Sequence, residues 1–378
     1  MQNHILILGG GFGGLAAANE LRAKLPDVKI TVIDKKDYFM MDLVKLWIIK
    51  GSRQFETSKK PLRLITKKGI DFVNESVTKI DPIQKRVLTT SRAFSYDYLI
   101  IALGVELAPE KIVGLEQFGL ILYDINQISK IRQKIIDMES GRIAIAITGM
   151  PYKCPPAPFE AALIINHMLK ELGKRDAFTI DFYSTAPITL PAAGPEVSAQ
   201  VLQILESEKI NFYGSCKTMA VEEGTMQFEN KNSGEFDLLI AVPPHKAPSV
   251  VYESGLAMED QFIVVGRDCK TSHDGVYAIG DVTTMMVKPN IAVPKAGIFA
   301  ESEGIEVAKD IISRIKNEKN NSIFEGKGGC FVETGKSAGY VYVDMFADPD
   351  PITRLDEPAE EHMREKEKFE NERLRSWF

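Results

Sequence analysis

The first hydrophobic segment of the chain, Ile5 to Leu8, runs directly into a glycine cluster and then into an alanine-rich segment, Leu15 to Ala18. Four consecutive aliphatic residues bounded by glycine predict a buried strand, and the segment after the glycines predicts a helix. A second aliphatic run, Lys29 to Ile33, predicts the next strand. A strand, a glycine-rich turn, a helix and a second strand in this order are typical of a dinucleotide-binding α/β unit.

The glycines of the first turn match the G-x-G-x-x-G fingerprint at Gly9, Gly11 and Gly14. In this pattern the first glycine makes the turn, the second lets the backbone approach a pyrophosphate, and the third lets helix and strand pack closely. Asp34 ends the second strand 20 residues after Gly14 (34 − 14), where a carboxylate can accept the hydroxyls of an adenosine ribose. We therefore expect a dinucleotide at this turn, with its phosphates at the helix N-terminus.

The alternation of hydrophobic strands and helices begins again near residue 141. Arg142 to Ile147 predicts a strand, 161–172 an amphipathic helix, and Phe178 to Tyr183 the next strand. The turn between the first strand and the helix carries prolines and bulky residues over 150–159, which cannot form a second phosphate-binding glycine turn. We expect a second Rossmann-like domain that has lost its nicotinamide site.

Two further segments resemble those of flavoproteins with two dinucleotide-binding domains. Tyr96 to Gly104 matches the Y-D-x-L-I-I-A-L-G segment with which the chain leaves the FAD domain, and Val276 to Val282 matches the A-x-G-D segment with which it returns. By this resemblance Gly104 and Gly280 lie at the cofactor and Asp281 contacts the ribityl chain. The expected fold is α/β with two Rossmann-like, glutathione-reductase-like domains and a short C-terminal region. The expected ranges are 1–110 with 266–320 for the FAD domain, 111–265 for the second domain, and 321–378 for the C-terminal segment.

Composition narrows the function classes. The 378 residues carry a formal net charge of −6, and 44% are hydrophobic. This acidic balance argues against nucleic acid as a partner, because phosphate binding needs a basic face. No apolar run approaches the roughly 20 residues of a membrane-spanning helix, and Met1 to His4 leaves no room for a signal sequence. We expect a cytoplasmic protein whose membrane contact, if any, is peripheral.

The four cysteines show no C-x-x-C spacing, so neither a metal site nor a structural disulfide is expected. Cys154 precedes the predicted helix and follows Lys153, and both features are expected to lower its thiol pKa. Glu160, one or two turns into that helix, is a candidate general base. Cys330 follows a glycine run that lets the backbone approach a planar ligand. Cys216 and Cys269 are expected to be ordinary buried residues, and His245 an ordinary loop histidine rather than a proton carrier.

The chain resembles the sulfide:quinone oxidoreductase family over nearly its full length. The matching segments are 153–160 (KCPPAPFE), 294–301 (PKAGIFAE) and 329–335 (GCFVETG). The resemblance implies FAD, with Lys295 in the segment that opens a long helix towards the flavin. It also implies that Cys330 is the thiolate next to the flavin, that Cys154 forms the persulfide, and that electrons pass from sulfide to a quinone.

This sequence departs from the family pattern at two places. Residues 119–130 contain no cysteine, so FAD is expected to bind non-covalently. The tail, 357–378, is short and highly charged rather than apolar. Its tip, Leu374, Trp377 and Phe378, is expected to pack on a neighbouring subunit of a homo-oligomer, with contact to a membrane interface as the alternative.

Three other functions remain open at this point. They are a sulfide dehydrogenase flavoprotein that donates to a cytochrome, a type II NADH dehydrogenase, and a redox-sensing FAD protein that binds a protein partner. The absent second glycine fingerprint argues against the NADH dehydrogenase, because the nicotinamide cofactor would lack its phosphate-binding turn.

Overall fold

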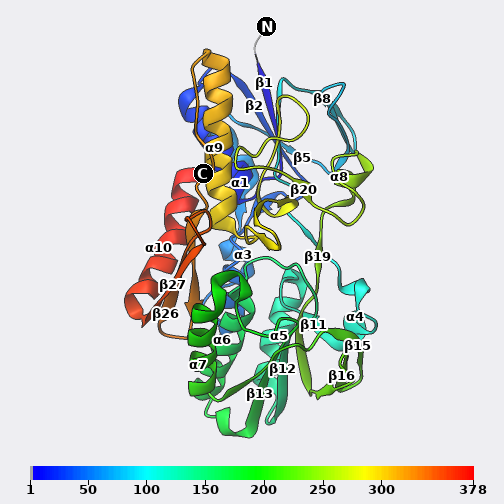
Figure 1. The fold of residues 1–378 in the computed structure, drawn as a ribbon, viewed down its shortest axis with the longest axis vertical. Helices are drawn as coiled ribbons and strands as arrows, with labels where there is room; N and C mark the ends of the chain where they lie inside the picture. Colours follow the sequence, from blue (N-terminus) through cyan, green and yellow to red (C-terminus); the bar gives the residue numbers. More distant parts are fainter. Residues whose placement is uncertain (1–2) are drawn as a thin grey trace.

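The computed structural model describes residues 3–378, which form two parallel sheets one above the other with a smaller antiparallel sheet at their side (Figure 1). The first sheet has the order β21-β9-β1-β2-β5. Its strands are β1 (His4–Leu8), β2 (Lys29–Asp34), β5 (Asp71–Asn74), β9 (Tyr98–Ile101) and β21 (Val276–Ala278). The residues of β1 are buried on both faces, as a central parallel strand requires.

Helices α1 (Phe12–Lys24) and α9 (Gly297–Lys316) pack against each other on one face of the first sheet. Their close approach depends on glycine. A Cβ added at Gly304 would lie 2.4 Å from the carbonyl oxygen of Gly13, and one added at Gly13 would lie 2.9 Å from the carbonyl oxygen of Ala300. Any larger residue at these two positions would push the helices apart.

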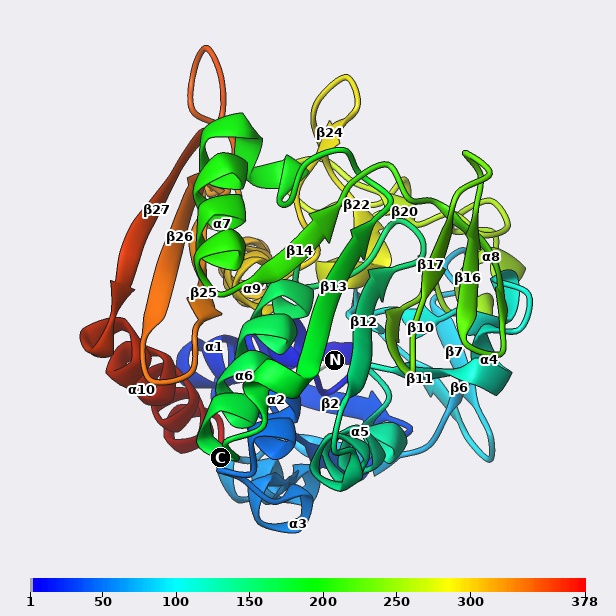
Figure 2. The same cartoon turned by 90° about the horizontal axis from the view of Figure 1, so that it is seen from below.

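The second sheet has the order β11-β18-β12-β13-β14, and all its strand pairs are parallel. Helices α5, α6 and α7 pack beside it (Figure 2). Its elements are β11 (Gly119–Ile121), α5 (Ile125–Asp137), β12 (Gly141–Ile147), α6 (Ala157–Glu171), β13 (Phe178–Ser184), α7 (Gly194–Ser207), β14 (Ile210–Tyr213) and β18 (Leu238–Val242). Helix α6 begins four residues before the predicted start, because prolines are tolerated in a first helical turn.

The C-terminal sheet β25-β26-β27 and helix α10 lie along one side of the molecule. Their bounds are β25 (Lys327–Glu333), β26 (Ala338–Asp344), β27 (Ile352–Ala359) and α10 (Glu360–Trp377). The glycine-rich sequence of β25 does not predict a strand; pairing with β26 along its whole length holds it extended. The domain boundaries at 110, 265 and 320 stay predictions.

Shorter elements connect these parts. The chain crosses between the two parallel sheets along the antiparallel pair β10 (Glu106–Leu107) and β19 (His245–Lys246). The other short strands are β3 (Tyr38–Phe39), β4 (Lys60–Pro61), β6 (Val77–Asp81), β7 (Arg86–Thr89), β8 (Ala93–Ser95), β15 (Thr218–Glu222), β16 (Thr225–Phe228), β17 (Ser233–Glu235), β20 (Ile263–Val264), β22 (Thr283–Thr284), β23 (Met286–Lys288) and β24 (Ile291–Ala292). The other short helices are α2 (Val44–Lys50), α3 (Phe55–Ser58), α4 (Leu115–Phe118) and α8 (Ser249–Glu253).

Candidate functional site

The glycine turn after β1 has the geometry that a bound dinucleotide needs. Gly9 has φ +107°, and a Cβ there would lie 2.1 Å from the carbonyl oxygen of Ala102. A Cβ at Gly14 would lie 1.9 Å from the carbonyl oxygen of Gly9, whereas one at Gly11 would meet nothing within 4 Å. Gly11 is also the N-cap of α1 and gives no side-chain cap, so no capping side chain competes with a ligand for the first N–H groups of the helix.

Asp34 lies beside this turn at the end of β2. Its Oδ2 accepts the Gly10 N–H at 2.7 Å and its Oδ1 accepts the Lys36 N–H at 2.8 Å. Each carboxylate oxygen keeps a second lone pair for a ribose hydroxyl. Gly104, just beyond β9, has φ +67° with open space around it. These positions fit the adenosine half of FAD.

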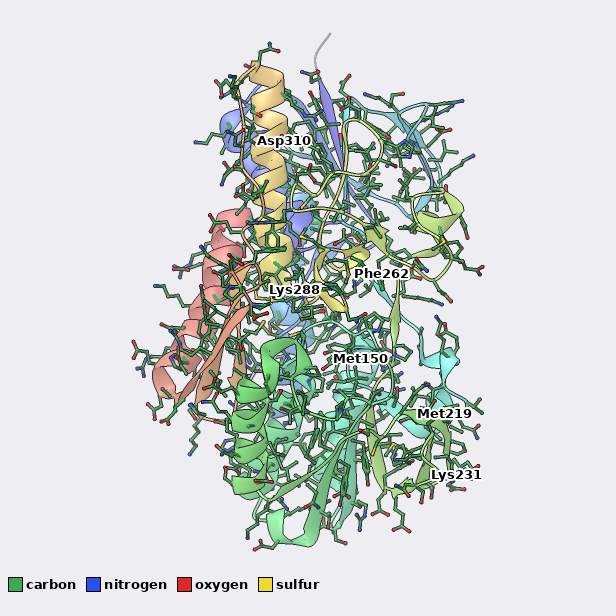
Figure 3. All side chains as sticks on the ribbon, viewed as in Figure 1. Met150, Met219, Lys231, Phe262, Lys288 and Asp310 are labelled. Atoms are coloured by element: carbon green, nitrogen blue, oxygen red, sulfur yellow. The ribbon has the colours of Figure 1, made fainter. Side chains whose placement is uncertain are left out.

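The second group of predicted cofactor residues is half-buried beside the start of α9. Asp281 Oδ1 is buried and has no hydrogen-bond partner among residues 3–378. Lys295 Nζ donates to the carbonyl oxygens of Asp281 and Thr283, both at 2.7 Å, and lies 3.5 Å from the ring centroid of Phe262, labelled in Figure 3. Burial lowers the pKa of Lys295 to about 8. An unpaired buried carboxylate oxygen beside the predicted flavin segment fits a ligand that donates a hydroxyl, as the ribityl chain of FAD does.

A buried carboxyl that the sequence did not single out supports this segment. Glu303, in the second turn of α9, accepts the N–H of Gly280 at 2.5 Å, where φ is +72°. Burial raises the pKa of Glu303 to about 7, and the charge of Asp281 acts in the same direction. Glu303 therefore holds the turn that carries Asp281.

The fold brings Cys154 and Cys330 together although 176 residues separate them (330 − 154). Cys154 lies in the turn before α6, with its N–H donating to the carbonyl oxygen of Lys295 at 2.6 Å, and Cys330 lies in β25. The two thiols are close enough that a charge on Cys330 raises the pKa of Cys154. Cys154 also has φ +51°, a left-handed conformation that costs a non-glycine residue about 1–2 kcal/mol.

The expectation that Lys153 and the helix N-terminus lower the pKa of the Cys154 thiol is wrong. Burial raises the pKa of Cys154 well above its usual value, and negative charge on Cys330 and Glu160 acts in the same direction. The Lys153 ammonium is instead paired with Asp42. Burial also raises the pKa of Cys330 to about 12. Both groups are thiols near neutral pH, so their reaction needs a base.

Glu160 lies beside both cysteines, in the first turn of α6. Its Oε1 accepts Lys366 Nζ at 2.5 Å and the backbone N–H of Glu333 at 2.9 Å. Burial raises the pKa of Glu160, with Glu333 adding to the effect and Lys366 opposing it. Among residues 3–378 no hydrogen bond reaches Oε2, so that oxygen can exchange a proton with a neighbouring thiol.

Glu160 belongs to a buried charge network that the sequence reasoning missed. Lys366 of α10 is 1% exposed and also donates to Glu333 Oε2 at 3.0 Å. Glu333 further accepts Trp47 Nε1 and Lys50 Nζ, both at 2.8 Å. The charged tail sequence gives no signal for Lys366, because its neighbours on both sides are charged and exposed.

The apolar tip of the tail packs within its own chain. Trp377 is 4% exposed and meets Phe12 and Phe39 edge to face, with ring centroids 5.4 and 5.5 Å apart. The expectation that Trp377 packs on a neighbouring subunit is therefore wrong. Most other residues of α10 are solvated, as predicted. Over residues 3–378 the chain forms no helix with the length and apolarity to cross a bilayer.

The turn after β12 does not resemble a phosphate-binding turn. A Cβ at Gly149 would lie 2.7 Å from the ring of Pro244, so a proline fills the space above this glycine. Met150 is 53% exposed at the junction of the two sheets (Figure 3). After Gly149 the turn continues with Met150 and Pro151 instead of the glycines of a phosphate-binding turn.

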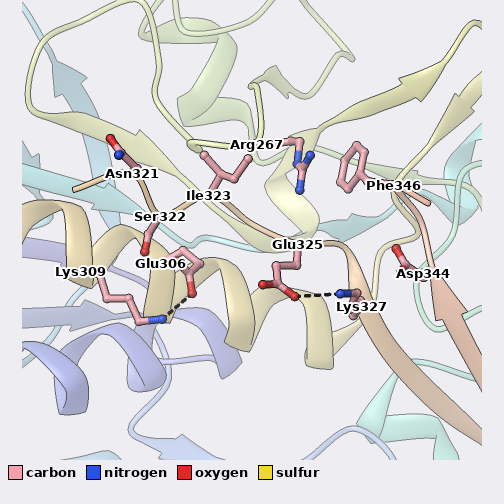
Figure 4. A pocket seen from close by; sticks show the side chains of 10 residues that line it. All are labelled: Arg267, Glu306, Lys309, Asn321, Ser322, Ile323, Glu325, Lys327, Asp344 and Phe346. Carbon is pink, nitrogen blue, oxygen red and sulfur yellow. Dashed lines mark hydrogen bonds and ion pairs between the residues drawn. The ribbon is translucent and has the colours of Figure 1, made fainter. Parts of the chain in front are cut away.

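An open groove of about 450 Å³ lies elsewhere, between α9 and β26 (Figure 4). Charged side chains line it, and four of them form two salt bridges: Lys309 with Glu306, and Lys327 with Glu325. None of the predicted site residues lines this groove. Its paired charges and wide opening are those of a solvated surface.

Comparison with known proteins agrees with this geometry. Residues 3–306 match the pyridine nucleotide-disulphide oxidoreductase family. The chain is 26% identical over 367 residues to a sulfide-quinone reductase of Aquifex aeolicus, covering 92% of this chain and 85% of the relative. It is 22% identical over 371 residues to a type II NADH:quinone oxidoreductase of Staphylococcus saprophyticus, covering 90% of each.

One solved structure superposes on almost the whole chain. The sulfide:quinone oxidoreductase of Aquifex aeolicus gives a TM-score of 0.90 at 25% identity, covering 99% of this chain and 91% of that one. The expected fold class and the expected resemblance to sulfide:quinone oxidoreductases are both confirmed.

Proposed function

Because the chain belongs to the pyridine nucleotide-disulphide oxidoreductase family, we propose that it is an FAD-dependent enzyme that oxidises sulfide through Cys154 and Cys330 and passes the electrons to a quinone. The observation that carries the proposal is the meeting of these two cysteines beside Asp281 and Lys295. The sulfide:quinone oxidoreductase resemblance supplies the substrates.

The cysteine pair performs the sulfur chemistry. When the pair is oxidised to a disulfide, a hydrosulfide sulfur bonds to the Cys154 sulfur as the Cys154–Cys330 S–S bond breaks, so Cys154 becomes a persulfide and Cys330 leaves as a thiolate. Positive charge on Lys366 favours this thiolate, since it lowers the pKa of Cys330 against the effect of burial. FAD, when bound, takes the electron pair from sulfur and delivers it to the quinone.

Glu160 exchanges protons with the cysteine pair. Its raised pKa brings a carboxyl towards the neutral range, where an acid–base group works best. Lys366 and the Glu333 N–H fix its Oε1, which leaves Oε2 as the proton-carrying atom. Glu160 is thus held in one orientation while both thiols are deprotonated in turn.

The cofactor is proposed to be held without a covalent bond. Residues 119–130 contain no cysteine, and Gly9, Gly11, Gly14, Asp34, Gly104, Gly280, Asp281 and Lys295 offer only backbone, carboxylate and ammonium groups. Acid precipitation should therefore release all of the flavin into the supernatant. Yellow colour that stays with the precipitate would contradict non-covalent binding.

A quinone is lipid-soluble, so we propose peripheral contact with the cytoplasmic face of a membrane. The buried Trp377 leaves little apolar surface on α10 for this contact. Flotation of the holoprotein with liposomes tests it, and a chain lacking 373–378 tests whether the tail takes part. We also propose a homo-oligomer, which sedimentation of the holoprotein would measure.

Anaerobic mixing separates this function from its rivals. Sodium sulfide should bleach the flavin rapidly, added quinone should restore the colour, and NADH should act far more slowly because the turn after β12 lacks the glycine fingerprint. Rapid bleaching by NADH would favour a type II NADH dehydrogenase, reoxidation by cytochrome but not quinone would favour a sulfide dehydrogenase, and no response to sulfide would favour a redox sensor.

A further inference from the structure

His245 lies where an open α/β sheet binds its ligands. The strand order of the second sheet reverses at β12. From β12 the chain adds β13 and then β14 on one side, and it later adds β18 on the other side of β12. Ligands bind beyond the carboxyl ends of strands at such a switch point. His245 follows β18 by three residues, and its N–H donates to the carbonyl oxygen of Pro151 at 2.8 Å, in the turn that carries Cys154.

The imidazole of His245 is buried, and only one of its two ring nitrogens has a hydrogen-bond partner among residues 3–378. The side chain is 3% exposed, and its Nδ1 lies 2.9 Å from the carbonyl oxygen of Pro243. A carbonyl oxygen can only accept, so Nδ1 carries the proton and Nε2 keeps a lone pair. Within residues 3–378 Nε2 is buried without any hydrogen-bond partner. A buried acceptor without a donor is costly and marks a position where a ligand can donate.

The surroundings of His245 connect it to Cys154. Its ring meets Tyr123 edge to face, with centroids 5.3 Å apart, and the Tyr123 hydroxyl donates to the carbonyl oxygens of Lys153 and Cys154 at 2.7 and 3.3 Å. Burial raises the pKa of Tyr123 well above its usual value, so the hydroxyl stays a donor. A single aromatic ring therefore separates His245 from the backbone of the reactive cysteine.

Charged side chains lie close to His245. Asp42 pairs with both Lys45 and Lys153, and Asp281 is close enough to Lys153 to raise its pKa further. Lys153 and Asp42 are close enough to His245 to affect its pKa, which burial, followed by Lys153, lowers to about 4. The imidazole is therefore neutral at neutral pH. A ligand that suits this site has a hydrogen to donate to Nε2 and can lie near the Lys153 ammonium group.

We propose that His245 binds the hydrosulfide substrate. Its Nε2 accepts a hydrogen bond from the S–H group, which turns the sulfur lone pairs towards Cys154. Hydrosulfide is a small anion with a single S–H bond, so it can lie near the Lys153 ammonium group and donate to the unpartnered acceptor. No bond is broken in this step, because the proton stays on sulfur. The inference rests on the proposed oxidation of sulfide.

The experiment compares hydrosulfide with methanethiolate, an anionic sulfur nucleophile without an S–H bond. Flavin bleaching is recorded after anaerobic mixing of the holoprotein with each anion, and the persulfide or mixed disulfide on Cys154 is measured by mass spectrometry of the quenched protein. In His245→Phe the ring and its contact with Tyr123 remain, but the acceptor is lost. The preference for hydrosulfide over methanethiolate should fall about tenfold, as expected for one hydrogen bond.

Two amide variants keep the test decisive if the Phe variant does not fold. His245→Gln places an amide oxygen near the position of Nε2 and should retain most of the preference. His245→Asn places it near Nδ1 and should behave like the Phe variant. His362→Phe is the matched control, since His362 Nδ1 makes a similar contact with a carbonyl oxygen, that of Ala338 at 3.0 Å. The preference of this variant for hydrosulfide over methanethiolate should equal that of the wild type.

The inference is overturned if His245→Phe slows both anions equally or leaves the preference unchanged, because neither result needs an S–H acceptor. It is also overturned if the Gln and Asn variants are indistinguishable. Failure of sulfide to bleach the wild-type flavin or to modify Cys154 is a separate result: it removes the proposed function and, with it, the substrate assigned to His245.

Discussion

Lys366 Nζ lies 2.5 Å from Glu160 Oε1, although the two residues are 206 positions apart and both are almost fully buried. Lys366 comes from the C-terminal helix, and Glu160 lies in the first turn of the helix that follows Cys154. Glu160 and Glu333 raise the pKa of Lys366 against the effect of burial, so the lysine stays charged. The tail of the chain thus completes the charge balance beside the two cysteines.

Removing this lysine should destabilise the protein. Lys366→Met leaves two buried carboxylates with less compensation, and loss of one partner of a buried pair costs about 3–5 kcal/mol. We expect the thermal midpoint of the holoprotein to fall by several degrees, measured by scanning calorimetry. Adding Glu160→Gln to Lys366→Met should recover part of the loss, because one unpaired carboxylate is then gone.

The control for this prediction is Lys368→Met on the same helix. Lys368 is exposed and lies 3.6 Å from Glu372, and an exposed pair contributes little. Its midpoint should stay close to wild type. An equal fall in both variants would mean that helix propensity, and not the buried network, explains the effect.

Cys154 and Cys330 should both be required for the same reaction, the oxidation of sulfide. Cys154→Ser and Cys330→Ser should each lower sulfide-dependent quinone reduction at least about 100-fold, because serine lacks a nucleophilic, polarizable sulfur. The double variant should be little worse than either single one, since residues that act as a unit are not additive. Steady-state quinone reduction measures all three.

Cys216→Ser and Cys269→Ser are the matched controls, because both residues are buried and neither is among the groups that shift the pKa of Cys154 or Cys330. Their activity should be near wild type. Full activity of Cys330→Ser with bound FAD would overturn the mechanism, and inactivity of Cys269→Ser alone would identify a different reactive cysteine.

Glu160→Gln should separate the proton-transfer role from the structural one. The amide oxygen can still accept the Glu333 N–H and the Lys366 ammonium, but the side chain can no longer exchange a proton. We expect flavin reduction by sulfide to slow about 100-fold, a typical general acid–base contribution. Stopped-flow absorbance measures it, with Glu171→Gln at the exposed end of α6 as control. A rate equal to wild type would leave Glu160 as a purely structural residue.

Glu303 should make the stability depend on pH. Its pKa is about 7 in the folded protein against an ordinary 4.5, so between these values the folded state holds a proton that the unfolded chain has lost. The free energy of unfolding therefore falls as pH rises through this interval, by roughly 3 kcal/mol in total. Glu303→Gln keeps the acceptor for Gly280 and removes the titration.

Thermal midpoints at pH 5 and pH 8 measure this effect. The gain of Glu303→Gln over wild type should be small at pH 5 and largest at pH 8. Glu306→Gln, whose carboxylate pairs with Lys309 near the surface of the same helix, should show no such change. A gain that is the same at both pH values would mean that Glu303 does not titrate in this range.

The local features of the fold could be predicted from the sequence, because they depend on neighbouring residues. The glycine turn at Gly9 to Gly14, the buried strands before and after it, and the loss of the second glycine turn all follow from short patterns of glycine, proline and aliphatic residues. The shared site of Cys154 and Cys330 was instead implied by the resemblance of the segments around them to sulfide:quinone oxidoreductases. Strand β25 escaped prediction because pairing with β26 outweighs the poor strand propensity of glycine.

The sequence by itself determined which residues we propose to carry the chemistry: the glycine turn, the two cysteines, Glu160 and Asp281. The tertiary structure alone decided their protonation and their partners. Burial raises the pKa of both thiols, Lys366 arrives from the far end of the chain to pair with Glu160, and His245 is left with a free acceptor beside the turn of Cys154. Solvation and charge depend on what lies nearby in space, and no pattern of neighbouring residues along the chain specifies that.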